Sequence, residues 1–194
     1  MTVTTDPLAY YARHGCALFP IPAGSKSPVG IVSSFKHDHS TDPAQWAKWH
    51  AEHNCNFGIV AFASRLIIAD VDTNKIGRDA AWQEWCNLCA SWGLDAPLMP
   101  HCQSARGGWH IYLSVPAEVD ASRLRQPDAV RDIINLRCVG FTVAAGSTYN
   151  DEGTPRPYSL LSDAPPYPAP AALIEYCTRK PTPRTAATPT GSRD

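Results

Sequence analysis

The stretch Arg65-Leu66-Ile67-Ile68-Ala69-Asp70-Val71-Asp72-Thr73 decides how the rest of the chain is interpreted. An apolar run free of glycine and proline leads into two carboxylates, a pattern that predicts a buried strand. Residues i and i+2 of a strand share a face, so Asp70 and Asp72 should project together, roughly 7 Å apart at Cβ. A divalent cation such as Mg²⁺ or Mn²⁺ would relieve their repulsion. Alternatively, the strand simply ends here and Asp72 opens a turn.

Composition describes an ordinary water-soluble globular chain. Of the 194 residues, 44% are hydrophobic and 18% are charged. The net charge of −1 provides no global attraction to nucleic acid, so any such binding must come from a local patch or a partner. Seven cysteines without a regular framework indicate reduced thiols. Neither an export signal nor an apolar run of roughly 18 residues is visible, so we expect a cytoplasmic protein without a membrane anchor.

Periodicity and capping residues predict the main elements. We expect helices over residues 6–15, from Thr41 to Pro43 onward, over 80–92 and over 171–177. Further strands are expected over residues 16–22, 57–62, 109–113, 138–145 and 158–161, with a hairpin loop at 150–154. The first of these should be an edge strand because it contains Pro20. Strand 57–62 should pair antiparallel with the Asp70 strand, because only a short connection separates them.

The helix that begins near Thr41 should bury one face. Trp46, Trp49 and His50 recur at positions i, i+3 and i+4, which is the spacing of a buried helical stripe.

A second polar segment carries glycines, a cation and a histidine. Ser104, Arg106, Gly107 and Gly108 precede a strand that contains His110. Adjacent glycines let a backbone approach a phosphate, while Arg and His can donate to its oxygens. Taken alone, the segment is better explained as a hairpin turn; taken with the Asp70 strand, it favours phosphate plus metal. Lys26, in a polar loop, is explained more simply as a solvated cation.

Other metal-ligand patterns are weaker. Cys86 and Cys89 form a C-x-x-C with His101 and Cys102 downstream, but the pair lies within a predicted helix and a second clean pair is missing. We therefore expect core packing there and no zinc. The residues His37-Asp38-His39 are expected to form a surface loop.

The order of these segments resembles the N-terminal primase-polymerase (prim-pol) domain of bifunctional replication proteins from plasmids and phages, in the archaeo-eukaryotic primase superfamily. The resemblance covers roughly residues 7–177. The matching segments are Ala17-Leu18-Phe19-Pro20-Ile21, Ser25-Lys26-Ser27-Pro28, Thr41-Asp42-Pro43-Ala44-Gln45-Trp46, Asn56-Phe57-Gly58-Ile59, Asp70-Val71-Asp72, the Ser104 to Tyr112 segment with Gly107, Gly108 and His110, and the Gly140 to Ala144 segment followed by Ser147, Gly153 and Tyr158.

This resemblance implies an α+β protein with the archaeo-eukaryotic primase fold, an RRM-like mixed or antiparallel sheet with flanking helices. It implies a nucleotidyltransferase, a DNA primase and DNA-directed DNA polymerase that copies a template with two divalent ions, Mg²⁺ or Mn²⁺. The implied metal ligands are Asp70, Asp72 and Asp132. Asp132 is the nearest acid to the family's third motif, "D-i-r-g", although it lies about two residues too far upstream. The implied triphosphate-binding residues are Ser104, Arg106, Gly107, Gly108 and His110, with Lys26 as a further phosphate or template contact.

The resemblance also sets expectations for organisation and partners. Residues 1–178 would form the catalytic domain, and residues 179–194 a flexible linker to a helicase-type C-terminal part. The partners would be single-stranded DNA template and dNTP or rNTP in a bacterial host cell, with a monomeric isolated domain. Two alternatives remain. One is a non-catalytic nucleotide- or DNA-binding module of a replication protein. The other is a DNA-nicking replication initiator, which needs paired histidines and a nucleophilic tyrosine.

Overall fold

The computed structural model describes residues 5–127 and 133–179. Its largest sheet has six strands around β3 (Leu66–Val71). Along the sheet the order is β10 (Ser159–Leu160), β4 (Cys102–Gln103), β5 (Trp109–Ser114), β3 and β6 (Ile134–Arg137), and β11 (Tyr167–Pro168) adds to β5. Both neighbours of β3 are antiparallel to it, and only the β11–β5 pair is parallel among the described strand pairs. The prediction of a buried strand ending in Asp70 is therefore confirmed.

A smaller sheet contains three antiparallel strands in the order β1 (Leu18–Ile21), β2 (Asn56–Val60) and β7 (Phe141–Val143). As predicted, β1 is an edge strand. The prediction that β2 pairs with β3 is wrong, because the two strands belong to different sheets. The short connection does not form a hairpin. Arg65 adopts a left-handed conformation (φ 49°), and the chain passes directly from one sheet to the other.

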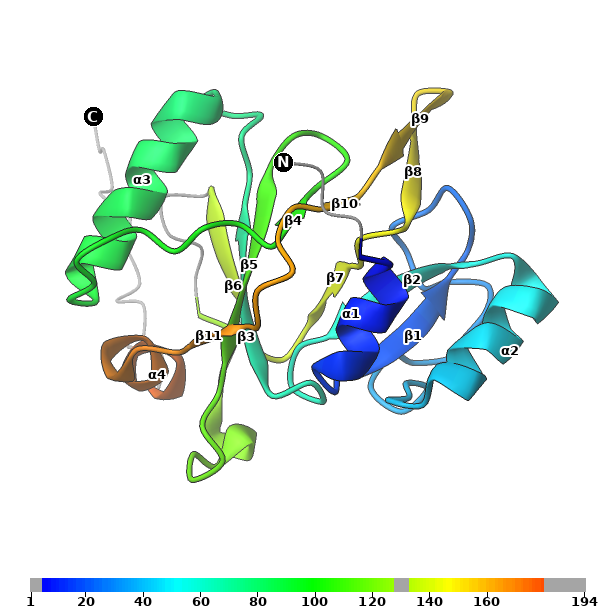
Figure 1. Ribbon diagram of the computed structural model, residues 1–194, viewed down its shortest axis with the longest axis horizontal. Helices are drawn as coiled ribbons and strands as arrows, with labels where there is room; N and C mark the ends of the chain where they lie inside the picture. Colours follow the sequence, from blue (N-terminus) through cyan, green and yellow to red (C-terminus); the bar gives the residue numbers. More distant parts are fainter. Residues whose placement is uncertain (1–4, 128–132, 180–194) are drawn as a thin grey trace, which may run out of the picture.

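Four helices flank the sheets in the described part of the chain (Figure 1). They are α1 (Pro7–Arg13), α2 (Pro43–His53), α3 (Arg78–Ser91) and α4 (Ala171–Thr178). The first two begin at aspartate caps: Asp6 Oδ1 accepts from the Leu8 amide at 3.1 Å, and Asp42 Oδ1 accepts from the Ala44 amide at 2.9 Å. These observations agree with the predicted helices. No described helix is long and apolar enough to cross a membrane.

The predicted buried face of α2 is only partly correct. Trp46 is buried, and its indole donates to the Ser40 carbonyl at 2.7 Å. Trp49 is half-buried and His50 is exposed. The ring of His50 lies beside the Cys55 carbonyl at the end of the helix, 3.1 Å away, where polar contact replaces burial.

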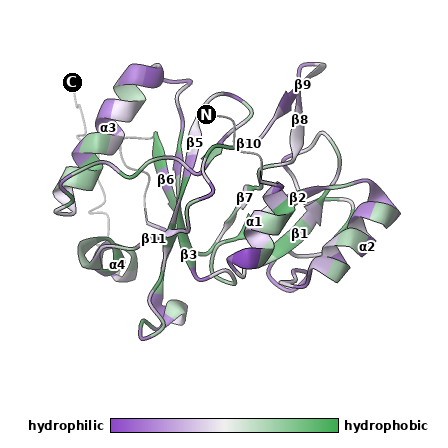
Figure 2. Ribbon diagram, viewed as in Figure 1, coloured by the Kyte–Doolittle hydropathy of each residue, from purple (hydrophilic) through white to green (hydrophobic). Residues whose placement is uncertain are grey.

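Two hydrophobic cores lie on opposite faces of β3. Leu66 and Ile68 belong to the core shared with α1, α2 and the three-stranded sheet, whereas Ile67, Ala69 and Val71 belong to the core shared with α3 and α4. The hydropathy colouring shows the apolar central strands, in contrast to the hydrophilic hairpin formed by β8 (Thr148–Asp151) and β9 (Thr154–Pro157) (Figure 2). The alternation places Asp70 on the face that looks toward the three-stranded sheet.

The architecture is α+β, as the sequence predicts. The predicted hairpin at residues 150–154 and the predicted C-terminal helix are present. The proposed linker, residues 179–194, lies outside the described residues except for Arg179.

Candidate functional site

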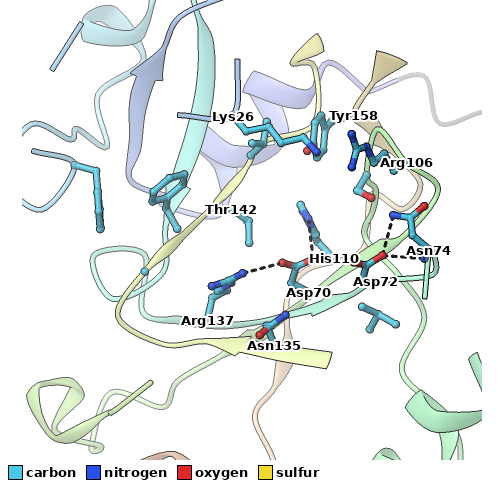
Figure 3. A pocket seen from close by; sticks show the side chains of 16 residues that line it. Lys26, Asp70, Asp72, Asn74, Arg106, His110, Asn135, Arg137, Thr142 and Tyr158 are labelled. Carbon is cyan, nitrogen blue, oxygen red and sulfur yellow. Dashed lines mark hydrogen bonds and ion pairs between the residues drawn. The ribbon is translucent and has the colours of Figure 1, made fainter. Parts of the chain in front are cut away.

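A pocket of about 470 Å³ opens between the six-stranded and three-stranded sheets (Figure 3). It lies on the Asp70 face of β3, next to the core shared with α1, α2 and the three-stranded sheet. It brings together six residues that the sequence singled out: Lys26, Asp70, Asp72, Ser104, Arg106 and His110. These residues come from three separate parts of the chain and meet in one space, with both carboxylates and three side chains that can be cationic.

Asp70 lies between two side chains that can be cationic. Its neighbours in the sheet are His110 on β5 and Asn135 on β6. Arg137 donates to its Oδ2 at 3.3 Å, and His110 Nε2 lies 3.7 Å from its Oδ1. The carboxylate is thus held between an imidazole and a guanidinium while its side chain remains 28% exposed toward the pocket.

Asp72 directly follows β3. Both interpretations of the sequence, a turn at Asp72 and convergence with Asp70, agree with its position. Its Oδ1 accepts from the backbone N–H and the side-chain Nδ2 of Asn74, each at 2.9 Å, so it does open a turn. It also lines the same pocket as Asp70, so the predicted convergence of the two side chains is observed.

The glycine pair forms a hairpin turn, as one interpretation of the sequence held. The backbone N–H of Ser104 donates a hydrogen bond to the Gly108 carbonyl, and Gly107 has a left-handed φ of 85°. A Cβ on Gly108 would lie 2.4 Å from the Val71 carbonyl oxygen. The missing side chain of Gly108 therefore allows β5 to approach β3, whereas Ser104 and Arg106 are the members of this segment that line the pocket.

The β8–β9 hairpin holds two cations at the mouth of the pocket. Arg106 Nε donates to Asp151 Oδ1 at 3.0 Å, and the hydrogen bond lowers the pKa of Asp151. Lys26 Nζ lies 3.9 Å from the centre of the Tyr149 ring, a cation–π geometry. Burial, and next the nearby Arg106 guanidinium, lower the pKa of Lys26.

Unsatisfied polar atoms concentrate in this pocket. Of four buried side-chain atoms without a hydrogen-bond partner in the described residues, three belong to pocket residues: His110 Nδ1, Arg137 Nε and Thr142 Oγ1. Buried polar atoms without a partner are costly, and they usually indicate a missing ligand or water. Burial lowers the pKa of His110, against the opposing effect of Asp70, so the ring favours the neutral form with one N–H.

Asn135 and Arg137 were not selected from the sequence. Strand β6 alternates buried Ile134 and Leu136 with Asn135 and Arg137, which face the pocket. That period of two was the available signal, but without a known register it does not show which strand lies beside β6. Asp132, the predicted third carboxylate, lies outside the described residues.

The cysteine and histidine patterns outside the pocket have structural explanations. Cys89 packs in the core beside α3. Both ring nitrogens of buried His101 are engaged: Nδ1 accepts from the Tyr112 amide at 3.1 Å, so Nε2 carries the proton toward the Pro165 carbonyl, 3.2 Å away. His37 and His39 lie in a loop, and Asp38 between them accepts from the backbone amides of Ser33 and Ser34.

The donor set of the pocket suits a hard divalent cation. Carboxylate oxygens and nearby phosphate-binding cations are what a magnesium–nucleotide complex requires, since Mg²⁺ commonly uses one or two carboxylates plus substrate phosphates. Within residues 5–127 and 133–179, no cluster of three or more His, Cys, Asp or Glu side chains is arranged to hold a metal alone. Asp70 and Asp72 would thus provide carboxylate oxygens for a metal that substrate phosphates also coordinate.

Comparison with known proteins agrees with this geometry. The family model for the N-terminal domain of bifunctional DNA primase/polymerase (Prim-Pol) matches residues 7–172. A search of curated proteins gave no match. The matched range contains every described residue of the pocket, and the α+β architecture is that of the family. On this match over most of its length, the chain belongs to the bifunctional DNA primase/polymerase N-terminal family.

Proposed function

We propose that the pocket catalyses template-directed nucleotidyl transfer, synthesising primers and extending DNA. Membership of the family indicates a primase/polymerase activity in replication. The observation that carries the proposal for this chain is the convergence of Asp70 and Asp72 with orphaned polar groups and cations in one pocket. Such a set combines acidic oxygens for a metal with donors for phosphate, and phosphoryl transfer needs mainly positioning and charge neutralisation.

In this proposal, Asp70 and Asp72, with Asp132, would hold Mg²⁺ or Mn²⁺. When bound, these ions supply neutralisation of the triphosphate and alignment of a primer 3′-hydroxyl with the α-phosphate. The residues of the chain bind and orient the nucleotide. Lys26 and Arg106 attract the triphosphate, and Ser104 adds a hydroxyl donor. His110 is buried, and burial lowers its pKa and favours the neutral ring with one N–H. Its Nε2 lies 3.7 Å from Asp70 Oδ1, too far for a hydrogen bond, so this nitrogen is available to donate to a phosphate oxygen.

The experiment is primer extension and de novo priming on single-stranded DNA with dNTPs or rNTPs and Mn²⁺. Asp70→Asn and Asp72→Asn each remove one carboxylate charge while preserving size. We expect each variant to lose at least 100-fold in rate with an unchanged unfolding midpoint. Asp95→Asn, at an exposed position away from the pocket, is the matched control and should retain full activity. Undiminished synthesis in the double variant would exclude this assignment.

One observation favours a second candidate, a module that binds nucleotide without polymerising it. Arg137 already neutralises part of the Asp70 charge, as a cationic side chain would in a site that needs no metal. Nucleotide binding by titration calorimetry, with no product in the extension assay, would support this alternative.

The wider assignments rest on the family resemblance. We propose single-stranded DNA as template, a helicase-type part following the domain, and a phage or plasmid replication context in a bacterial cell. A monomeric domain spanning residues 1–178 is part of the same proposal, which sedimentation of that fragment would test.

A further inference from the structure

Among the described residues, the edge of the pocket next to Asp70 carries an amide, Asn135, and a cation, Arg137. Strand β6 pairs with β3 so that Asn135 lies opposite Asp70 and Arg137 lies opposite Ile68. Ile134 and Leu136 point into the core behind the sheet, which fixes Asn135 and Arg137 on the pocket face. A one-residue shift of this register would bury a guanidinium, so the arrangement is strongly specified.

The two carboxylates are therefore partly satisfied without any metal. Arg137 donates to Asp70 Oδ2 at 3.3 Å, and both Asn74 donors engage Asp72 Oδ1. Lys26 stands on the opposite side of the pocket (Figure 3). Among the described residues, a divalent cation entering this pocket alone would meet two carboxylates together with the positive charges of Arg137 and Lys26.

Arg137 is also free to change partner. Its side chain is 37% exposed, and its Nε, which is buried, has no hydrogen-bond partner among the described residues. A guanidinium can donate two parallel hydrogen bonds to phosphate, whereas it makes one to Asp70 here. A triphosphate would thus offer Arg137 a better partner and release Asp70.

We propose that this site binds its divalent cation together with the nucleoside triphosphate and only weakly before it, with Arg137 moving from Asp70 to a phosphate oxygen. Asn135 favours the same order of binding, because its neutral amide oxygen beside Asp70 attracts a free divalent cation less strongly than a carboxylate would. The inference rests on the proposed function and adds an order of binding to it.

The test measures Mn²⁺ binding directly, from the electron paramagnetic resonance signal of free Mn²⁺, with and without a non-hydrolysable dNTP analogue. A titration of the analogue alone corrects for Mn²⁺ bound to nucleotide in solution. For the unaltered protein we expect nucleotide to tighten Mn²⁺ binding at least tenfold. Asn135→Asp and Arg137→Gln should each tighten nucleotide-free Mn²⁺ binding at least fivefold, and Arg137→Gln should also weaken binding of the analogue.

Matched controls are Asn87→Asp on the exposed face of α3 and Arg123→Gln in the 3₁₀ turn at Ala121–Arg123. They make the same charge changes at exposed positions that do not line the pocket and should leave Mn²⁺ binding unchanged. Because Asn135→Asp and Arg137→Gln alter different side chains, a folding defect in one, detected by circular dichroism, leaves the other to decide.

Two results would overturn the inference. They are tight nucleotide-free Mn²⁺ binding by the unaltered protein, or no tightening of nucleotide-free Mn²⁺ binding in either pocket variant. If primers are extended but one of these is seen, only the order of binding fails. If the protein neither extends primers nor binds the analogue with Mn²⁺, the proposed function itself fails.

Discussion

Gly108→Ala should separate the two strands that carry the carboxylates and the histidine. The added Cβ would lie 2.4 Å from the Val71 carbonyl oxygen, about 1 Å inside the 3.4 Å at which ordinary contact begins, and 3.1 Å from Ser104 Oγ. The Val71 carbonyl is backbone and cannot rotate away, because Val71 pairs with Trp109 on β5 and with Ile134 on β6. The start of β5 must therefore move away from the end of β3.

Overpacking of this kind costs about 1–3 kcal/mol. For a domain of this size, about 2–4 °C of melting temperature is lost per kcal/mol, so we expect a decrease of roughly 2–12 °C. Because the displaced strands carry Asp70 and His110, a shift of about 1 Å should lower kcat/KM for nucleotide incorporation about 100-fold. Thermal unfolding and primer extension measure the two effects on the same preparation.

Gly140→Ala is the matched control for stability. Gly140 also lacks a left-handed conformation, and its added Cβ would meet only Arg137 Cδ at 4.0 Å. It should change the free energy of unfolding by less than about 0.5 kcal/mol. Equal stability and activity in Gly108→Ala and the unaltered protein would refute the argument that this glycine sets the spacing of β3 and β5.

Two further predictions concern buried polar groups. Tyr11→Phe removes a hydroxyl that accepts from the Ala145 amide at 2.7 Å and lies 3.1 Å from the Tyr112 hydroxyl. Urea denaturation should therefore show a decrease of about 1–3 kcal/mol in the free energy of unfolding. Tyr176→Phe, at a partly exposed position, should show almost no decrease. Equal midpoints for the two variants would contradict this. Burial lowers the pKa of His101 in the folded protein. The unfolded chain therefore takes up a proton near pH 6.5 that the folded protein does not. As a result, the free energy of unfolding should fall as pH drops below about 6.5. His101→Asn should reduce that slope, measured by urea denaturation between pH 5 and pH 8, and an unchanged slope would show that His101 is not the group responsible.

The sequence predicts the local structure well where local chemistry determines it. The aspartate–proline starts of α1 and α2 were recognisable because the cap and the first turn are encoded within three residues. The Asp70 strand was recognisable from its apolar run. The candidate site was found largely because the resemblance joined the Asp70 and His110 segments, which are 40 residues apart but adjacent in the sheet.

What the sequence could not provide was the pairing of distant strands. A connection of a few residues suggested that β2 and β3 form a hairpin, yet each already has two other partners, and the competition among possible partners is decided by burial across the whole molecule. For the same reason Asn135 and Arg137 were not predicted. Their alternation with apolar residues is visible in the sequence, but the strand that pairs with β6 is not. His50 is exposed although it lies on the same helical stripe as Trp46. The spacing therefore predicts which face of the helix packs on the core, but not which residues of that face are buried.

The position of the pocket follows from the way β3 divides the molecule. Its odd-numbered residues Ile67, Ala69 and Val71 pack toward α3 and α4, while Leu66 and Ile68 pack toward the three-stranded sheet. Asp70 lies on the same face of β3 as Leu66 and Ile68, at the edge of the core that these two residues join. Its carboxylate must therefore lie between the two sheets. Polar residues of β5 and β6 in register with it face the same space. A carboxylate at position 69 or 71 would instead be buried in the core beneath α3, and for that reason the alternation of this one strand determines where chemistry can occur.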